Sequence, residues 1–516
     1  MSCPIIITIL VLCGCSTIIF PADSARILAV ELTGGRSHWN FMRSVLQSLI
    51  EKGHNLTIFS PFSDIEGCGV NCSLIDTSKD YPTTGSINIA TVLKTLSSTV
   101  SLISQSVNIT RNRCNAMYNN TDINKILMVR NNSDYEVLLI EPMATECASH
   151  LAGILQIPVV YLIPSPMLTF VEPILFGHTP NPAVVSHILS QHAVLRKFVQ
   201  RCINSVLLAY SLISREYYEW IIKKNHPQSY DSIESVKPSL VFVNSHYITE
   251  PSRPVPPNLI PIGGIHLSQP KTIPKDILEF IENSPHGVIY FTFGSVVSMS
   301  TLPDHIQNAF KEAFAQVPLR VLWKYEGEMK DKPINVMTSK WFPQRDILMH
   351  PNVKLFISHG GISGVYEAVD AGVPVLGFPL FYDQPRNIDN LVEAGMGISM
   401  DLLTLQKDEL LTNILELINN EKYMKNAKIV SDRFKDRPMS PAESVVYWTE
   451  YVIRHKGAPH LKSHAFNLTW YQYFLLDVIF VIFIFISFVI FIIYKLFKTI
   501  YYYFLKYSQT IKPKLQ

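Results

Sequence analysis

The chain has 516 residues, of which 44 are basic and 42 acidic, so its net charge is only +2. A chain of this length is too long to fold around a single hydrophobic core, which predicts two domains of roughly 200 residues each. Because charges of both signs are interspersed, the sequence excludes the concentrated basic face typical of nucleic-acid-binding proteins, and no nucleic-acid partner is expected. Apolar strand-like runs that alternate with helical patterns predict an α/β fold.

The N-terminus is apolar but short. The two apolar runs, residues 5–12 and 17–20, are too short for a stable membrane-spanning helix and are followed by small residues. We interpret residues 1–25 as a cleaved secretory signal peptide, although no Lys or Arg precedes the first apolar run.

Residues 26–250 are expected to form the first domain. Its strands are predicted at 26–32, 56–59, 137–140, 159–162 and 241–244; helices are predicted up to Lys52, where Gly53 is a typical stop residue, and over 148–155. This alternation is Rossmann-like. Proline density over 158–187 excludes one regular helix. After its first strand this region is expected to form loops that shape a lipophilic cavity, lie against a membrane, or only cover the core.

A proline-rich linker over residues 251–275 is expected to join this domain stiffly to a second one over 276–465. The second domain opens with a strand that leads into the Gly294-Ser295 turn. Further strands are predicted at 321–324, 353–357 and 373–378, with a helix that ends near Asn420 and a last helix over 441–454.

The most informative stretch is 341–384. It contains a strand, the turn His359-Gly360-Gly361, a helix that carries Glu367, a second strand and the pair Asp383-Gln384. Backbone N–H groups at a helix N-terminus bind phosphate, and glycine lets the backbone approach a ligand closely. A carboxylate one turn into the helix can accept two ribose hydroxyls. Binding of a nucleotide sugar explains this order of elements. Packing of a strand and a helix would explain the glycines, but neither the His nor the acidic residues.

The same stretch resembles, position by position, the signature of the UDP-glycosyltransferases: Phe356 through Gly361, then Gly364, Glu367, Pro374, Pro379, Asp383 and Gln384. Residues 464–477 also resemble metazoan, especially arthropod, members. The resemblance covers nearly the whole chain. It implies the GT-B architecture of two facing Rossmann-like domains, a UDP-sugar donor (UDP-glucose ahead of UDP-glucuronate), and a small lipophilic acceptor.

The resemblance also implies roles on the donor side. Stacking on uracil, worth roughly 1–3 kcal/mol, is expected of Trp341. Base or ribose contact is expected of Gln344, diphosphate contact of Ser295, His359, Gly361 and Ser363, ribose binding of Glu367, and sugar-hydroxyl binding of Asp383 and Gln384. The family often has Asn where Ser363 stands, so the diphosphate contact of Ser363 is expected through its backbone.

Transfer to a hydroxyl needs a base, and the candidate is His38 in the loop after the first strand. The tripeptide Ser37-His38-Trp39 matches membrane-bound UDP-glycosyltransferases. In the family an Asp supports this His; here two glutamates, Glu141 and Glu146, are the alternatives, and neither is Asp. Direct displacement by the acceptor would convert an α-linked donor into a β-glycoside.

No metal or other cofactor is expected, because the chain has no Asp-x-Asp, the motif that holds Mg²⁺ or Mn²⁺ against the diphosphate in the other glycosyltransferase architecture.

Five cysteines follow the signal region, so at least one has no partner within the chain. Their pairing is open, and Cys68-x₃-Cys72 can form a local disulfide but lacks further ligands for zinc. The five are Cys68, Cys72, Cys114, Cys147 and Cys202.

A transmembrane helix is predicted at 474–494, because its apolar length reaches about 30 Å. The tail, residues 495–516, has five lysines and no acidic residue, which is typical of a cytosolic flank. Lys512 and Lys514 resemble a dilysine retrieval signal. Together these features predict a single-pass type I protein of the endoplasmic reticulum membrane with lumenal domains. Six glycosylation sequons precede the span, at Asn55, Asn71, Asn108, Asn119, Asn131 and Asn467.

The missing Asp also raises an alternative of another class, a membrane-anchored protein that binds UDP-sugar with little or no turnover. Acceptor-dependent release of UDP distinguishes it from an enzyme. The sequence leaves the acceptor's identity and the oligomeric state open.

Overall fold

The computed structural model describes residues 24–83, 85, 88, 99–128, 134–143, 145–190, 192–295 and 297–511. These residues form two compact units. One holds the chain up to Leu175 together with Thr179–Lys462, and the other holds Phe176–His178 and Ser463–Gln516. Nearly all of the predicted signal peptide, the sequon at Asn131, and the tail lysines Lys512 and Lys514 lie outside the described residues.

The first unit contains a seven-stranded sheet in the order β3-β2-β1-β4-β5-β6-β7, with every neighbouring pair parallel. Its central strands are buried on both faces, as expected of a parallel sheet covered by helices. Their bounds are β1 (Arg26–Val30), β2 (Asn55–Ser60), β3 (Cys72–Asp76), β4 (Val137–Ile140), β5 (Val159–Ile163), β6 (Leu240–Val243) and β7 (Leu259–Pro261).

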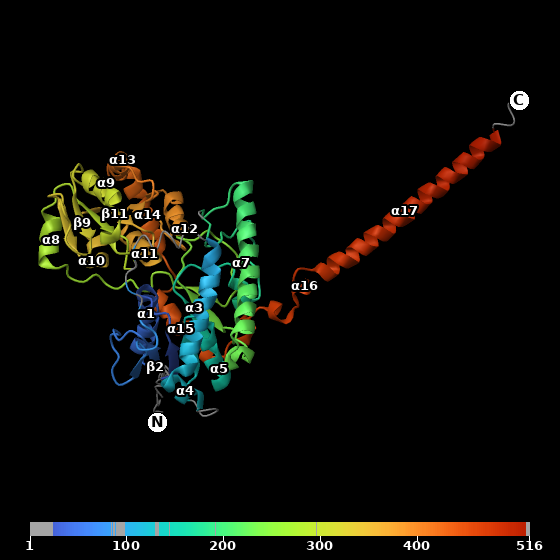
Figure 1. Ribbon diagram of the computed structural model, residues 1–516, viewed down its shortest axis with the longest axis horizontal. Helices are drawn as coiled ribbons and strands as arrows, with labels where there is room; N and C mark the ends of the chain where they lie inside the picture. Colours follow the sequence, from blue (N-terminus) through green and yellow to red (C-terminus); the bar gives the residue numbers. More distant parts are fainter. Residues whose placement is uncertain are drawn as a thin grey trace, which may run out of the picture. The chain divides into compact units, whose positions relative to one another are not determined.

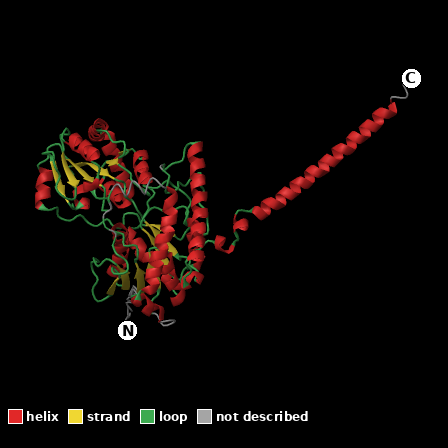
Figure 2. Ribbon diagram, in the orientation of Figure 1, coloured by secondary structure: helices red, strands yellow, loops and turns green. Residues whose placement is uncertain are grey.

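Helices surround this sheet, and Figures 1 and 2 show them in the same orientation. The longest, α7, lies beside α3. The helices are α1 (Arg36–Lys52), α3 (Thr99–Asn119), α4 (Thr121–Met128), α5 (His150–Leu155), α6 (Glu172–Phe176), α7 (Phe198–Asn225) and α15 (Pro441–Arg454), with a 3₁₀ turn η1 (Glu146–Ser149) before α5. The predicted end of α1 is confirmed: Gly53 caps it with a φ of 100°, which glycine adopts without strain.

A second parallel sheet, in the same unit, has six strands in the order β10-β9-β8-β11-β12-β13. A cluster of buried aromatic rings on one face, including Phe291, Phe310 and Trp323, forms its core. The strands are β8 (Val288–Thr292), β9 (Arg320–Lys324), β10 (Val336–Ser339), β11 (Val353–Ser358), β12 (Val375–Gly377) and β13 (Gly397–Ser399). The helices are α8 (Lys275–Glu282), α9 (Asp304–Phe314), α10 (Gln344–Leu348), α11 (Ile362–Ala371), α12 (Gln384–Glu393), α13 (Lys407–Asn419) and α14 (Glu421–Lys435).

Both sheets have a topological switch point. The strand order reverses between β1 and β4 in the first sheet and between β8 and β11 in the second. In open α/β sheets ligands bind outside the carboxyl ends of the strands at such a point, because the loops there diverge to opposite faces. The predicted pair of Rossmann-like domains is therefore confirmed, and the two switch points locate where a ligand can bind.

Two predicted boundaries differ from the structure. The last helix, α15, was assigned to the second domain (276–465), but Val445 and Val452 belong to the same core as Val45 and Leu49 of α1. The predicted linker, 251–275, contains β7, which completes the first sheet. The apolar face of an amphipathic helix such as α15 can pack on either sheet. Which sheet it covers depends on the path of the chain after Asn420.

Two local predictions are also corrected. The proline-rich region 158–187 was expected to be loop after its first strand, but it includes the short helix α6. His38 was placed in a loop, but it is the third residue of α1, because Gly35 is the N-cap and the helix already begins at Arg36.

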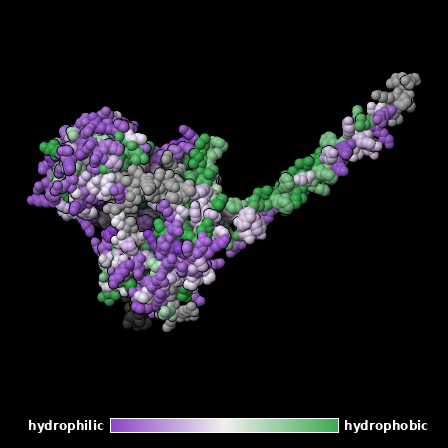
Figure 3. Space-filling view, in the orientation of Figure 1, coloured by the Kyte–Doolittle hydropathy of each residue, from purple (hydrophilic) through white to green (hydrophobic). Residues whose placement is uncertain are grey.

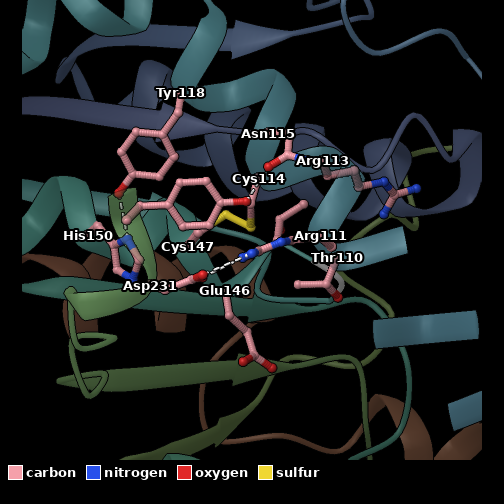
Figure 4. The surroundings of a disulfide bond; sticks show 12 residues. Thr110, Arg111, Arg113, Cys114, Asn115, Tyr118, Glu146, Cys147, His150 and Asp231 are labelled. Carbon is pink, nitrogen blue, oxygen red and sulfur yellow. Dashed lines mark hydrogen bonds and ion pairs between the residues drawn. A yellow bond between two sulfur atoms is a disulfide. The ribbon is translucent and has the colours of Figure 1, made fainter. Parts of the chain in front are cut away.

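Two disulfides brace the first domain. Cys68 pairs with Cys72, and Cys114 of α3 pairs with Cys147 of η1, while Cys202 is free and exposed. Figure 4 shows the second bridge with the contacts around it. Tyr118 Oη lies 2.7 Å from His150 Nδ1 in the same cluster. The bridge thus ties the α3 layer to the segment that follows β4.

The second unit consists mainly of two helices, α16 (Trp470–Tyr473) and α17 (Leu476–Ile511). Within Leu476–Gln509 an unburied window of 18 residues reaches a mean hydropathy of 3.2, so the helix is long and apolar enough to cross a membrane. Figure 3 shows a hydrophobic surface over the first part of this helix and hydrophilic residues towards its C-terminal end. The helix extends beyond the predicted span of 474–494 because no Gly or Pro interrupts it before Pro513.

Candidate active site

The switch point of the first sheet brings His38 and Glu141 together, although they are 103 residues apart in the chain. His38 lies in the first turn of α1, after β1, and Glu141 directly follows β4. His38 Nδ1 donates to Glu141 Oε1 at 2.5 Å. The carboxylate is 1% exposed and the imidazole 34% exposed, so the ring is the accessible member of the pair.

The carboxylate controls the protonation of this imidazole. Burial by itself would lower the pKa of His38, but the charge of Glu141 and its hydrogen bond outweigh burial, so the pKa is raised. With Nδ1 donating to Glu141, the lone pair lies on Nε2. The ring is thus held in the tautomer that can accept a proton, and the resulting imidazolium is stabilised.

Glu146, the alternative partner, contacts a different residue. Both of its carboxylate oxygens accept from Arg215 Nη2 of α7, each at 2.6 Å. Arg215 is only 10% exposed and needs this compensation for its charge. Of the two glutamates, the geometry therefore favours Glu141 beside His38 and gives Glu146 a role in holding α7.

The sequence interpretation missed three residues beside His38: Glu31, Thr33 and Arg113. Glu31 directly follows β1 and is fully buried, and its Oε1 accepts from the Thr33 backbone N–H at 2.8 Å. Arg113 of α3 donates to the Thr33 carbonyl at 2.6 Å. A signal for Glu31 did exist, since a charged residue at the carboxyl end of a strand in an α/β sheet lies at the ligand-binding edge.

His359 occupies the switch point of the second sheet, directly after β11. Its ring lies against two glycines: a Cβ on Gly294 would come within 2.8 Å of the ring and one on Gly361 within 2.6 Å. Burial, aided by the charge of Lys324, lowers the pKa of His359 to about 4, so the ring is neutral near pH 7. Its Nδ1 is buried without a hydrogen-bond partner among the described residues. A ligand oxygen or N–H could complete this site.

The N-terminus of α11 lies beside this ring. Gly361 is its N-cap, and Gly360 before it has a φ of 83°. His266 Nε2 donates to the carbonyl of Ser363 at 3.1 Å, which fixes the first turn of the helix. Ser295, after β8, is exposed. Free backbone N–H groups at this end can bind a phosphate.

A carboxylate of α11 is joined by a hydrogen bond to an amide at the start of α10. Gln344 Nε2 donates to Glu367 Oε2 at 2.5 Å, and burial raises the pKa of Glu367 to about 7. Trp341, just before α10, is 68% exposed, so its ring is available for stacking. These three predicted residues and the α11 N-terminus thus line one edge of the second sheet.

Asp383 and Gln384 begin α12 and differ in their roles. Gln384 is buried, and its side-chain oxygen accepts from the backbone N–H groups of Leu380 and Phe381 at 2.9 and 3.1 Å. Asp383 Oδ2 accepts from Asn387 at 2.7 Å. Burial raises the pKa of Asp383, while Asn387, Arg386 and His38 oppose this. The influence of His38 on the pKa of Asp383 indicates that these two side chains, from different domains, are within electrostatic reach of each other.

Direct bonds join the two domains near Asp383. The buried side chain of Arg386 donates to the Ser186 carbonyl at 3.0 Å and to Glu250 at 2.9 Å. Asp389, one turn further along α12, accepts from the Ala193 backbone N–H at 2.6 Å. The helix that begins with Asp383 is thus anchored on the first domain.

A cavity of about 280 Å³ lies on the first-domain side, next to the network around Glu31. Its wall mixes apolar and polar side chains: Leu32, Thr33, Asp80, Tyr81, Pro82, Ile109, Asn112, Arg113 and Ala116. One of the interpretations of residues 158–187 was that they shape a lipophilic cavity, and this cavity is lined by other parts of the domain. In the described ranges no group of three or more His, Cys, Asp or Glu side chains is arranged to hold a metal ion.

The chain is similar in sequence to proteins of one known family. Residues 26–511 match the family model described as "UDP-glucoronosyl and UDP-glucosyl transferase". The chain is 38% identical to UDP-glucosyltransferase 2 of Dactylopius coccus, with 91% of this chain and 92% of the relative covered. It is 32% identical to UDP-glucuronosyltransferase 2B17 of Mus musculus, over 86% and 87% of the two chains.

Solved structures give the same architecture. The calicheamicin glycosyltransferase CalG4 superposes with a TM-score of 0.52 at 16% identity, covering 84% of this chain and 99% of that one. The glycosyltransferase VinC in complex with dTDP gives 0.53 at 14% identity, covering 83% and 100%. At such identities the likeness establishes the GT-B fold alone.

Proposed function

The chain belongs to the UDP-glucoronosyl and UDP-glucosyl transferase family and is an enzyme that transfers sugar from a UDP-sugar. From this premise we propose that it moves glucose onto a hydroxyl of a small lipophilic acceptor, with His38 as the general base. The glucose donor is supported by the names of the insect relatives, one of which is a UDP-glucosyltransferase. The acceptor class is supported by the partly apolar cavity beside Thr33.

The proposed step is a direct displacement. The acceptor hydroxyl gives its proton to Nε2 of His38, and the acceptor oxygen forms a bond to the anomeric carbon of the sugar. The bond between that carbon and the diphosphate breaks, and UDP leaves with the electron pair. Attack from the face opposite to the leaving group inverts the anomeric configuration, so an α-linked donor yields a β-glycoside. General-base assistance of this kind contributes typically about 10²–10⁴-fold.

One observation carries this proposal: the 2.5 Å contact between His38 Nδ1 and Glu141 at a topological switch point. The contact fixes a partly exposed ring in the tautomer with a free Nε2 and supplies the carboxylate that the base needs. Glu has replaced the family's Asp, and the longer side chain still reaches the ring. That replacement had prompted the alternative of a binding protein without turnover, and the contact supports the enzyme with His38 as its base over that alternative.

The donor would lie along the edge of the second sheet. Trp341 would stack on uracil, Gln344 would contact the base or ribose, and Glu367 would accept the ribose hydroxyls. The diphosphate would lie at the N-terminus of α11 against Ser295, His359, Gly361 and the backbone of Ser363, supported by the unpartnered Nδ1 of His359. Asp383 would bind sugar hydroxyls. Gln384 would do so through its amide N–H groups, since backbone donors occupy its oxygen.

The cellular setting is proposed from the ends of the chain. The apolar helix α17 would anchor a single-pass type I protein in the endoplasmic reticulum membrane, with both sheets in the lumen. Disulfides between Cys68 and Cys72 and between Cys114 and Cys147 are consistent with an oxidising compartment. Glycosylation would occur at the sequons, of which Asn71, Asn108, Asn119 and Asn467 are exposed and Asn55 half-buried. Independence from divalent cations stays a prediction.

The test uses full-length protein in membranes with UDP-glucose, UDP-glucuronate and a panel of phenolic and alcoholic acceptors. We expect acceptor-dependent release of UDP and a β-glucoside detected by mass spectrometry. Substitution His38→Ala should lower kcat by at least about 10²-fold, because the base is lost, and should leave UDP binding within about twofold.

The matched control is His286→Ala, which removes an exposed histidine far along the chain from the site and should keep wild-type turnover. Retention of turnover by His38→Ala would reject the base assignment. Absence of acceptor-dependent UDP release from folded wild-type protein, with UDP binding intact, would restore the binding-protein alternative. A glucuronide as the main product would reject glucose as the donor sugar.

A further inference from the structure

A second buried carboxyl group lies beside the His38–Glu141 pair. Glu31 is the first residue after β1 and Glu141 the first after β4, and these neighbouring strands are in register, with Val30 opposite Ile140. The register therefore places the two glutamates next to each other at the switch point. They are 0% and 1% exposed. Two carboxylates this close and this buried cannot both be ionised without a large cost, so one of them must hold a proton.

The hydrogen bonds indicate which carboxyl group is protonated. Glu31 Oε1 accepts from both the backbone N–H and the hydroxyl of Thr33. The other oxygen, Oε2, is buried and finds no donor among the described residues. An oxygen in this position is satisfied if it carries a proton and donates it. Glu141 already accepts from His38 Nδ1, and its second oxygen is 3.4 Å from the Thr33 hydroxyl, so Glu141 is the ionised acceptor.

The surrounding charges agree with this assignment. Burial raises the pKa of Glu31 to about 8, with a further increase from the Glu141 charge, against opposing contributions from Thr33 and His38. The other charged or titratable groups of this cluster are Arg113 on α3 and Tyr81, which lies beside Arg113. With Glu31 neutral, the charges of Glu141 and Arg113 balance at neutral pH.

We propose that Glu31 is a positioning residue: as a neutral carboxylic acid it donates to the Glu141 carboxylate and holds that longer side chain against His38 Nδ1. This inference rests on the proposed role of His38 as the base. The proton stays on Glu31 throughout the reaction, and no bond to substrate is made. Glu141 has one more rotatable bond than an Asp would have, and a second hydrogen bond removes the freedom that this bond adds.

Two substitutions test the proposal in the full-length membrane protein. Glu31→Gln keeps the shape, can donate to Glu141 and accept from Thr33, and cannot ionise. Glu31→Leu removes the donor. The matched control is Glu51→Gln, an exposed glutamate on the same helix as His38. The measurement is the pH profile of kcat, together with KM for UDP-glucose, for all four proteins.

In the wild type we expect kcat to fall above about pH 8, where Glu31 ionises and repels Glu141. Glu31→Gln should keep kcat within about threefold at pH 7 and should lack this alkaline fall. Glu31→Leu should lower kcat by about tenfold or more at pH 7, with KM for UDP-glucose changed less than about twofold, since the donor lies on the other domain. Glu51→Gln should behave as the wild type does.

A readout without turnover accompanies the kinetics. The folded state keeps a proton on Glu31 that the unfolded state loses above its ordinary pKa of 4.5. The stability from this group is therefore complete below pH 4.5 and is lost as the pH rises through about 8. The melting temperature of the wild type, relative to that of Glu31→Gln, should fall as the pH rises from about 4.5 to about 8.

An alkaline fall in Glu31→Gln with the wild-type midpoint, or wild-type kcat in Glu31→Leu, overturns the proposal. If Glu31→Leu does not fold, the two profiles of Glu31→Gln decide alone. Failure here is distinct from failure of the proposed function. An active wild type with an inactive His38→Ala and unaffected Glu31 variants rejects only the positioning role, whereas an active His38→Ala rejects the base and this inference with it.

Discussion

At the scale of single residues, two glutamates five positions apart in the chain have different partners. Glu141 contacts the imidazole of His38, and Glu146 contacts the guanidinium of Arg215. Both are acidic residues that follow β4, and the sequence left both as candidates for the partner of His38. The distinction arises from the η1 turn, which directs Glu146 to α7.

This difference gives a paired prediction. Glu141→Gln should lower kcat by at least about 10²-fold, because an amide N–H can donate to His38 Nδ1 and so put the proton on Nε2, where the base must be free. Glu146→Gln should keep kcat within about twofold but destabilise the fold by about 1–3 kcal/mol, because Arg215 loses a charged partner. Turnover and thermal unfolding of both variants check it. A loss of turnover confined to Glu146→Gln would reverse the assignment.

At the scale of elements, the turn between β11 and α11 depends on the absence of side chains. Gly294 and Gly361 both lie against the edge of the His359 ring that carries Cε1 and Nε2, and Gly361 is also the N-cap of α11. The glycines of the family signature therefore have a physical role here: they leave room for a buried ring and for a ligand at the helix N-terminus.

Gly361→Ala tests that role. The new Cβ would lie 2.6 Å from His359 Nε2, while the backbone φ of −61° is ordinary for alanine, so the ring must move but the helix need not unfold. We expect KM for the UDP-sugar to rise about tenfold or more, equivalent to about 1.4 kcal/mol of binding, with a small change in melting temperature. Gly69→Ala, where no heavy atom lies within 4 Å of the new Cβ, is the control. Unchanged KM in Gly361→Ala would contradict a diphosphate site at this turn.

At the scale of the whole molecule, both sheets belong to one unit, and the apolar helix belongs to the other. The cross-domain bonds of Arg386 and Asp389 lie inside the first unit. The proposed donor and acceptor sites therefore require no residue of α17.

A truncation at residue 473 should release the protein from the membrane. Removal of the 34-residue segment, which contains an 18-residue window with a mean hydropathy of 3.2, takes away the span itself. We expect the truncated chain to remain in the supernatant after an alkaline carbonate wash and to bind UDP within about threefold of the full-length protein. A chain that ends at residue 511 keeps α17 and should stay in the pellet. Retention of the shorter chain in the pellet would show that another surface holds the membrane.

The sequence alone determined the fold class, the strand order along the chain, the family and the apolar helix, because strand runs, helix stops such as Gly53 and the stretch 341–384 are local patterns. It did not determine which sheet α15 covers, which glutamate meets His38, or that Glu31 lies beside Glu141. Those facts depend on the lateral order of the strands, which brings β1 next to β4 across more than a hundred residues. Neighbour relations of this kind arise from packing between segments that are far apart in the sequence, and local sequence patterns do not specify them.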